Sequence, residues 1–231
     1  MALFRRSPKA AAEDALDEGT AAVELPRAAH EGPWDVSEVP DRGARIDLGS
    51  LWVPGVHGME VRMEVDQKTQ RVTGVGVSLN GSALQIQAFA APRREGIWDE
   101  IRAEIAESVV KQGGSVDDVP GTFGRELLAR LPARTADGRT GHRPARFIGH
   151  DGPRWFLRGV VSGKAAVDVE AAKELEAVFG GTVVLRGDDA RPPRDLLALT
   201  LPGDGAPVEE TEPATPDLDP LTRGPEITEI H

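Results

Sequence analysis

The stretch RFIGHDGPRWFLRGVVSG, residues 146–163, contains a histidine, an aspartate, a tryptophan and three arginines. An imidazole and a carboxylate could serve acid–base catalysis, and guanidinium groups could bind phosphates or stack on bases. His150 and Asp151, however, are neighbours on an expected strand, and neighbouring strand residues point to opposite faces. We therefore do not expect these two residues to act as a catalytic pair.

Other motifs that could carry chemistry are incomplete. Ser162 lacks the Gly-x-Ser-x-Gly spacing that places a nucleophile on a strained, exposed turn. The glycines of GVGVSLNG, residues 74–81, do not have the spacing of a dinucleotide-binding loop. The chain has no cysteine, and its histidines do not show metal-ligand spacing. We expect no catalytic residue, no cofactor and no metal, and hydrolysis by His150 or Asp151 ranks third among the functions considered.

An excess of arginine marks residues 121–160, where eight arginines stand against three acidic residues. On a strand, Arg154 and Arg158 share one face and Trp155 lies on the other, so the tryptophan suits the core while the arginines face outward. These arginines could bind an anion, or they could pair with acidic residues of a helix or of the chain ends. The residues predicted to contact a partner or an anion are Arg143, Arg146, Arg154, Arg158 and Trp155.

The elements that must position these residues follow from periodicity and turn residues. Alternation of apolar and polar residues predicts strands within 44–55 and 60–66, and a hairpin over 71–90 that turns at Asn80-Gly81. Isoleucines at 97, 101 and 105 predict a helix over 96–112, which two glycines end. The first half is therefore a run of strands followed by a helix.

The second half repeats this order. Residues 123–133 suit a strand, with a short helix as the alternative, and 134–143 suit a loop. A hairpin over 143–163 turns at Asp151-Gly152-Pro153, a helix follows Asp168, and TVVLRG forms a last short strand. This order predicts an α+β fold, with a mainly antiparallel sheet of six to eight strands and two main helices packed on one face.

The net charge of −11 arises from the two ends of the chain. Residues 1–40 carry eight acidic and four basic side chains, and residues 203–231 carry eight and one, whereas the region between is balanced. Polar, proline-containing ends cannot bury enough apolar surface to offset the entropy lost on ordering. We predict disordered acidic tails at 1–32 and 203–231 around one globular domain at 33–202.

The absence of cysteine fits a reducing compartment. The first residues have no apolar run of the kind that a secretory signal needs, and no stretch of roughly 18 apolar residues is present. We therefore expect a cytoplasmic protein without a membrane contact.

Several motifs together resemble a known family. They are GPWDVSEVP, ARIDLGSLWVPG, GSALQIQAFAAPRREGIWDEIRAEI, DGPRWFLRGVVSG and RPPRDLLALTLP. Through them, residues 33–202 resemble a conserved actinobacterial family catalogued only as a domain of unknown function. The resemblance implies no activity and no catalytic residue.

Three functions remain open from the sequence. The first is a non-enzymatic, cytoplasmic domain that binds a protein partner as an adaptor or regulator. The alternative is a nucleic-acid- or nucleotide-associated factor that uses the arginine-rich region 121–160, and the third is a hydrolytic enzyme. The balanced charge of the middle region favours the protein partner, because nucleic-acid-binding domains are usually basic.

Overall fold

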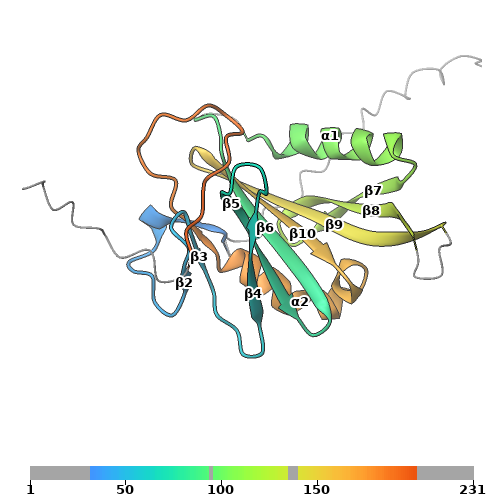
Figure 1. Ribbon diagram of the computed structural model, residues 1–231, viewed down its shortest axis with the longest axis horizontal. Helices are drawn as coiled ribbons and strands as arrows, with labels where there is room; N and C mark the ends of the chain where they lie inside the picture. The colour runs from blue at the N-terminus through green and yellow to red at the C-terminus, as the bar shows by residue number, and fades with distance from the viewer. Residues whose placement is uncertain (1–31, 94–95, 135–139, 202–231) are drawn as a thin grey trace, which may run out of the picture.

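The computed structural model describes residues 32–93, 96–134 and 140–201 (Figure 1). The predicted tails at 1–32 and 203–231 lie outside these ranges, apart from residue 32. Within them, no helix is both long and apolar enough to cross a membrane.

A seven-stranded antiparallel sheet forms the centre of the structure, and two strand meanders meet in its middle (Figure 1). In sheet order its strands are β4 (Glu60–Val65), β5 (Val72–Leu79), β6 (Ser82–Ala90), β10 (Trp155–Ser162), β9 (Thr140–Gly152), β8 (Gly124–Arg134) and β7 (Ser115–Gly121). The first meander ends with β6 and the second ends with β10, and these two strands pair with Leu157 opposite Ala88. The α+β class and the mainly antiparallel sheet are confirmed.

A second, small sheet joins the two ends of the described chain. Its strands are β1 (Trp34–Asp35), β11 (Val183–Val184), β3 (Leu51–Val53) and β2 (Ile46–Asp47). β1 and β11 are parallel, and the other pairs are antiparallel. The sequence predicted β3 and β11 as strands but gave no reason to expect a separate sheet, because its pairings join residues far apart in the chain.

The tight turns follow from the residues that form them. Asn80 and Gly81 both have positive φ, at 49° and 74°, and connect β5 to β6 as a two-residue hairpin turn requires. In the second hairpin the positive φ, 64°, belongs to Arg154 and not to Gly152. Pro153, whose ring fixes its φ, comes directly before Arg154 in the turn. The predicted hairpin is confirmed, and its turn lies one residue later in the chain than predicted.

The edge strand β7 was not predicted. Its sequence, SVDDVPG, contains two aspartates and a proline, which read as a loop. An edge strand needs hydrogen bonds on one side only, and charge or proline there hinders pairing with another chain. The adjacent β8 is the strand predicted at 123–133, whereas β9 takes in Thr140 to Arg143, part of the predicted loop.

The two helices lie on opposite faces of the large sheet, so the prediction that both pack on one face is wrong. Two consecutive residues of β10, whose side chains point to opposite faces, contact different helices. Phe156 packs with Trp98 of α1 (Trp98–Lys111), whereas Leu157 belongs to the cluster that contains Leu175 of α2 (Val169–Gly180). The physical reason is that the start of β10, residues 155–157, is buried on both sides, which places Phe156 in a second core on the α1 side.

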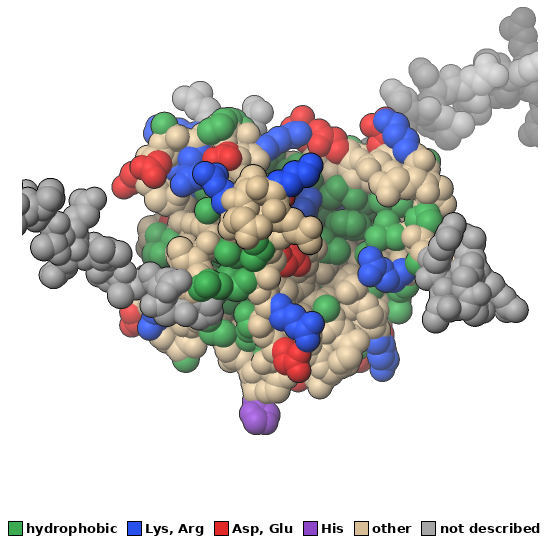
Figure 2. All heavy atoms as spheres, viewed as in Figure 1, with side chains coloured by type: hydrophobic (Ala, Val, Ile, Leu, Met, Phe, Trp, Pro, Cys, Tyr) green, Lys and Arg blue, Asp and Glu red, His purple; other side chains and the backbone are tan. Residues whose placement is uncertain are grey.

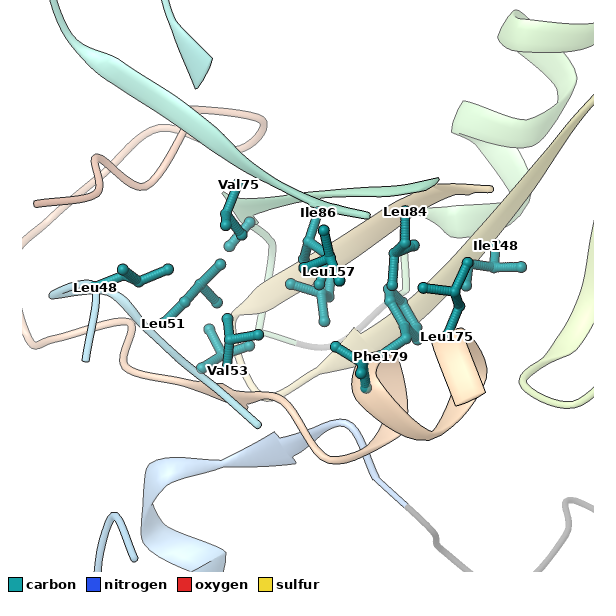
Figure 3. Close-up of a cluster of buried hydrophobic side chains, with 14 of the residues drawn as sticks. Leu48, Leu51, Val53, Val75, Leu84, Ile86, Ile148, Leu157, Leu175 and Phe179 are labelled. Atoms are coloured by element: carbon teal, nitrogen blue, oxygen red, sulfur yellow. The ribbon is translucent and has the colours of Figure 1, made fainter. Parts of the chain in front are cut away.

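The larger core lies between the seven-stranded sheet, α2 and the small sheet (Figure 3). Leu84 and Ile86 from β6 meet Phe179 of α2, and Leu51 and Val53 extend the same cluster into the small sheet. Asp168 caps α2 by accepting hydrogen bonds from the N–H groups of the first turn, as predicted. This face of the sheet is therefore closed by α2 and the small sheet together.

Replacement of Leu157 by alanine tests this core. Leu157 has no exposed surface, so Leu157→Ala should lower the free energy of unfolding by about 2–5 kcal/mol through lost burial and a residual cavity. Val110 of α1 is 58% exposed, and Val110→Ala should change the free energy of unfolding by no more than about 0.5 kcal/mol. Chemical denaturation measures both, and equal losses would contradict the assigned core.

Candidate functional site

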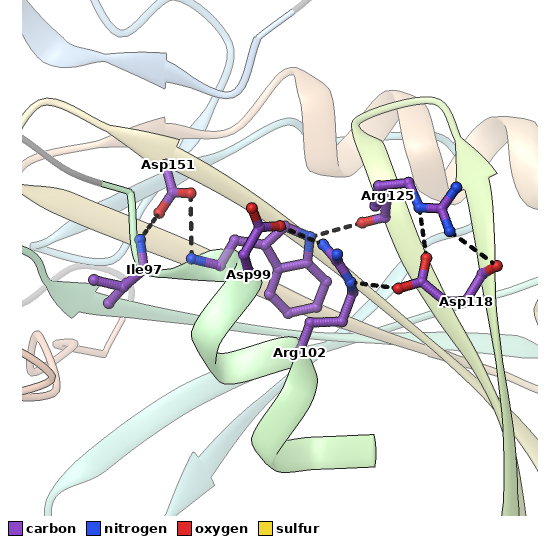
Figure 4. A network of polar contacts seen from close by, with 7 residues as sticks. Ile97, Asp99, Arg102, Asp118, Arg125 and Asp151 are labelled. Carbon is purple, nitrogen blue, oxygen red and sulfur yellow. Dashed lines mark hydrogen bonds and ion pairs between the residues drawn. The ribbon is translucent and has the colours of Figure 1, made fainter. Parts of the chain in front are cut away.

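The N-terminus of α1 is held to the sheet by a residue from the second hairpin (Figure 4). Ile97, at the N-cap position, makes no side-chain capping hydrogen bond. The carboxylate of Asp151 caps the helix instead. It accepts hydrogen bonds from the backbone N–H groups of Ile97 at 2.8 Å and Trp98 at 3.3 Å. A carboxylate here also complements the positive end of the helix dipole, so Asp151 has a structural task.

A tryptophan fixes the distance between α1 and the sheet. The ring of Trp98 lies over Gly149, where an added Cβ would be only 2.4 Å from a ring atom. Its Nε1–H donates to the carbonyl of Arg125 at 2.7 Å (Figure 4), and its ring stacks on Phe156 with 5.7 Å between centroids. Since any side chain at 149 would push the ring away, the glycine permits the close approach of the helix.

Charged residues then tie α1 to the edge of the sheet (Figure 4). Arg102 of α1 donates to Asp118 of β7 at 2.9 Å and to Asp99 at 2.6 Å. Arg125 of β8 donates to the same Asp118 at 2.6 Å. These contacts place α1 mainly over β7, β8 and β9, and on the same face the helix meets β6 and β10 at Phe89 and Phe156.

A hollow opens where the helix cover ends, and we call it the α1 groove. Its apolar walls are Phe89, Ile101, Ile105 and Phe156, and its basic residues are Arg158 and Arg194. Its volume is about 270 Å³. Figure 2 shows this side of the molecule, with hydrophobic side chains gathered next to α1 and basic side chains near them.

Arg158 is the half-buried cation of the α1 groove. Its guanidinium lies 5.3 Å from the ring centroid of Phe89 and donates to the side-chain oxygen of Gln87. Burial lowers the pKa of Arg158 below its usual value, and the negative charge of Glu64 opposes that shift. Among the described residues it forms no salt bridge, and its Nε–H is buried without an acceptor.

A row of polar side chains continues from Arg158 across the half of the sheet away from α1. Gln85 of β6 donates to Glu64 of β4, which reaches over the intervening strand β5. Gly74 of β5 makes this possible, because an added Cβ would lie 2.9 Å from Gln87 and 3.2 Å from Glu64. The sheet surface beside the groove is therefore polar, shallow and held by side-chain hydrogen bonds.

Arg146 lies on the other face, in a buried ionic cluster. It donates to Glu126 at 3.2 Å and to Glu176 of α2 at 2.6 Å. Thr122 donates to the second oxygen of Glu176 at 2.7 Å. Two carboxylates thus share one guanidinium, and Glu126 has no exposed surface. The cluster fastens α2 to β8 and β9.

The structure does not bring the five predicted contact residues to one surface. Arg158 lines the α1 groove, Arg146 is in the ionic cluster, and Arg143 is exposed on β9. Arg154 lies 3.6 Å from Asp188. Trp155 is fully buried and donates from Nε1 to Asp35 at 2.8 Å, which joins β1 to the large sheet.

The groups that suggested catalysis are also separated. His150 packs beside Trp155 on the α2 side, with 5.8 Å between ring centroids, whereas Asp151 caps α1 on the opposite side. Near the groove, Glu104 is paired with Arg194 at 2.9 Å. Within the described part of the chain, no group of three histidine or acidic residues could hold a metal ion. The arrangement suits binding better than acid–base chemistry.

Comparison with known proteins gives a family without an assigned activity. The family model described as "Protein of unknown function (DUF3710)" matches residues 32–207. No curated protein matches the sequence.

Removal of the α1 cap should cost stability. Asp151→Ala leaves two backbone N–H groups without their acceptor and should lower the free energy of unfolding by about 1–2 kcal/mol. Asp188 is fully exposed, and Asp188→Ala should change the free energy of unfolding by less than about 0.5 kcal/mol. Thermal or chemical denaturation compares the two, and an unchanged Asp151→Ala protein would rule out the cap.

Glu126 should make stability fall as the pH rises. Burial is the largest cause that raises the pKa of Glu126, the charge of Glu176 adds to it, and Arg146 opposes it. A carboxyl with a higher pKa in the folded chain binds its proton more tightly there. Its contribution to stability is therefore present below the ordinary pKa of glutamate and is lost as the pH rises through the raised pKa.

The variant Glu126→Gln stays neutral and lacks this dependence. As the pH rises from about 4 to about 7, the free energy of unfolding of the unsubstituted protein should fall relative to that of Glu126→Gln. Denaturation at several pH values measures the difference. Glu107→Gln, at an exposed position paired only with Lys111 among the described residues, serves as the control and should show no such trend. Parallel curves for Glu126→Gln and the unsubstituted protein would contradict the raised pKa.

Proposed function

We propose that this chain, which belongs to the DUF3710 family, is a non-enzymatic domain that binds a protein partner through the α1 side of its large sheet. The observation that carries the proposal is the unequal cover of the two faces. One face is closed by α2 and the small sheet, whereas on the other face α1 lies mainly over β7, β8 and β9 and meets β6 and β10 at Phe89 and Phe156. The α1 groove lies where this cover ends.

The composition of this surface suits a protein partner. Protein interfaces combine an apolar, aromatic centre with a polar rim, and arginine is enriched in them. Phe89 supplies aromatic surface in the α1 groove, Arg158 supplies the cation, and the row from Gln87 to Glu64 supplies polar surface beside it. A partner with an apolar anchor would find a fixed site here, because α1 is held in place by Trp98 and Asp151.

Two observations favour this function over nucleic-acid binding. The arginines of 121–160 are divided between opposite faces, and Arg125 and Arg130 are paired with Asp118 and Asp117 of β7. Glu100 and Glu104 also lie beside Arg194 at the edge of the groove and would repel a phosphate backbone. We place this binding function in the cytoplasm, which the cysteine-free sequence supports.

Site-specific photocrosslinking tests the proposal. A photoreactive amino acid at Ser108, an exposed residue that borders the α1 groove, should give protein adducts in cells. The same amino acid at Val167, which is 62% exposed and precedes α2, should not give those adducts. Nuclease treatment should leave the Ser108 adducts unchanged in size, and mass spectrometry identifies the partner.

A pair of small substitutions supplies the control for this experiment. Ile105→Ala removes part of the groove wall and should lower the yield of the Ser108 adducts several-fold, whereas Val110→Ala, at an exposed position on the same helix, should not. Adducts that are the same from both labelled positions, that contain nucleic acid, or that do not respond to Ile105→Ala would overturn the proposal.

A further inference from the structure

The α1 groove contains a cation whose hydrogen-bonding capacity is only partly used. A guanidinium has five N–H donors, and the described residues provide Arg158 with one acceptor, the side-chain oxygen of Gln87. Its Nε–H is buried and has no acceptor. Arg146, Arg186 and Arg191 also have a buried Nε–H without an acceptor, so what distinguishes Arg158 is that its unused donors belong to a guanidinium at the wall of a hollow.

The position of Arg158 is fixed before any ligand arrives. The hydrogen bond to Gln87 and the contact with the Phe89 ring hold the guanidinium, and Glu64 lies near enough for its charge to act on it without forming a salt bridge. By contrast, Arg194 at the other side of the groove is already paired with Glu100 and Glu104 at 3.0 and 2.9 Å. Arg158 is therefore the group in the groove that can receive an anion.

The remaining walls determine what the anion must be attached to. Phe89, Ile101 and Ile105 present partly exposed apolar surface, and the volume of about 270 Å³ holds a compact molecule. A small hydrated ion would leave these walls in contact with water. An anionic group on an apolar body would cover them and satisfy the guanidinium at the same time.

We propose that the α1 groove binds a small organic acid, with a carboxylate on Arg158 and an apolar body against Phe89, Ile101 and Ile105. A single negative charge fits better than the double charge of a phosphate group, because Glu64 and Glu104 lie near the site. This inference goes beyond the proposed function, since it needs no protein partner and can fail or hold independently of it.

The test uses 4-phenylbutyrate as the probe and its neutral amide as the matched control. Methyl NMR of the full chain should show shifts of Ile101 and Ile105 with 4-phenylbutyrate, and no shift of Ile148, which lies in the core on the other face. The amide should bind at least about tenfold more weakly, because it lacks the charge-assisted hydrogen bond. Inorganic phosphate alone should not produce the Ile101 and Ile105 shifts.

Substitution of the arginine locates the acid. Arg158→Gln should weaken binding of 4-phenylbutyrate at least about tenfold, Arg158→Lys should weaken it less because the charge remains, and Arg154→Gln should leave it unchanged. The Ile148 signal reports whether each variant is folded, and the comparison of acid with amide needs no variant. Equal binding of acid and amide, binding of phosphate at the same signals, binding unaffected by Arg158→Gln, or no binding of the acid would each overturn the inference.

Discussion

The close approach of the Trp98 ring to the backbone of β9 determines how one whole side of the molecule is built. The ring can lie there because residue 149 is glycine, and it brings α1 down onto Phe156 and β8. Asp151, two residues further along the same strand, caps the helix that the ring anchors. These two contacts, together with the ion pair between Arg102 and Asp118, hold α1 over β7 to β9 and so form one wall of the α1 groove.

Local sequence patterns predicted most individual elements, because the interactions that form them are also local. The hairpin at Asn80-Gly81 depends on two adjacent residues that tolerate positive φ, and α2 depends on the cap at Asp168. The assignment of helices to faces could not be predicted in this way. It depends on the pairing of β6 with β10, whose partners Leu157 and Ala88 are far apart in the chain.

The candidate site was predictable only in part. Strand alternation singled out Arg158 and suited Trp155 to the core, although Trp155 was also predicted to contact a partner, which its full burial does not support. The sequence could not separate Arg158 from Arg146, because the partners of Arg146 come from β8 and α2. One signal was overlooked: Ile97 is a poor residue to begin a helix, and an uncapped helix start indicates an acceptor elsewhere, which here is Asp151.

The parallel pairing of β1 with β11 bears on how the chain folds while it is being synthesised. Trp34 and Asp35 are made about 150 residues before their strand partners, Val183 and Val184. Trp155, whose indole N–H donates to Asp35, is made 120 residues after Asp35. The hairpin of β5 and β6 can form as soon as its two strands are made, whereas the small sheet can close only after Val184 has been made. The segment that becomes β1 therefore has no strand partner while both meanders of the large sheet are being made.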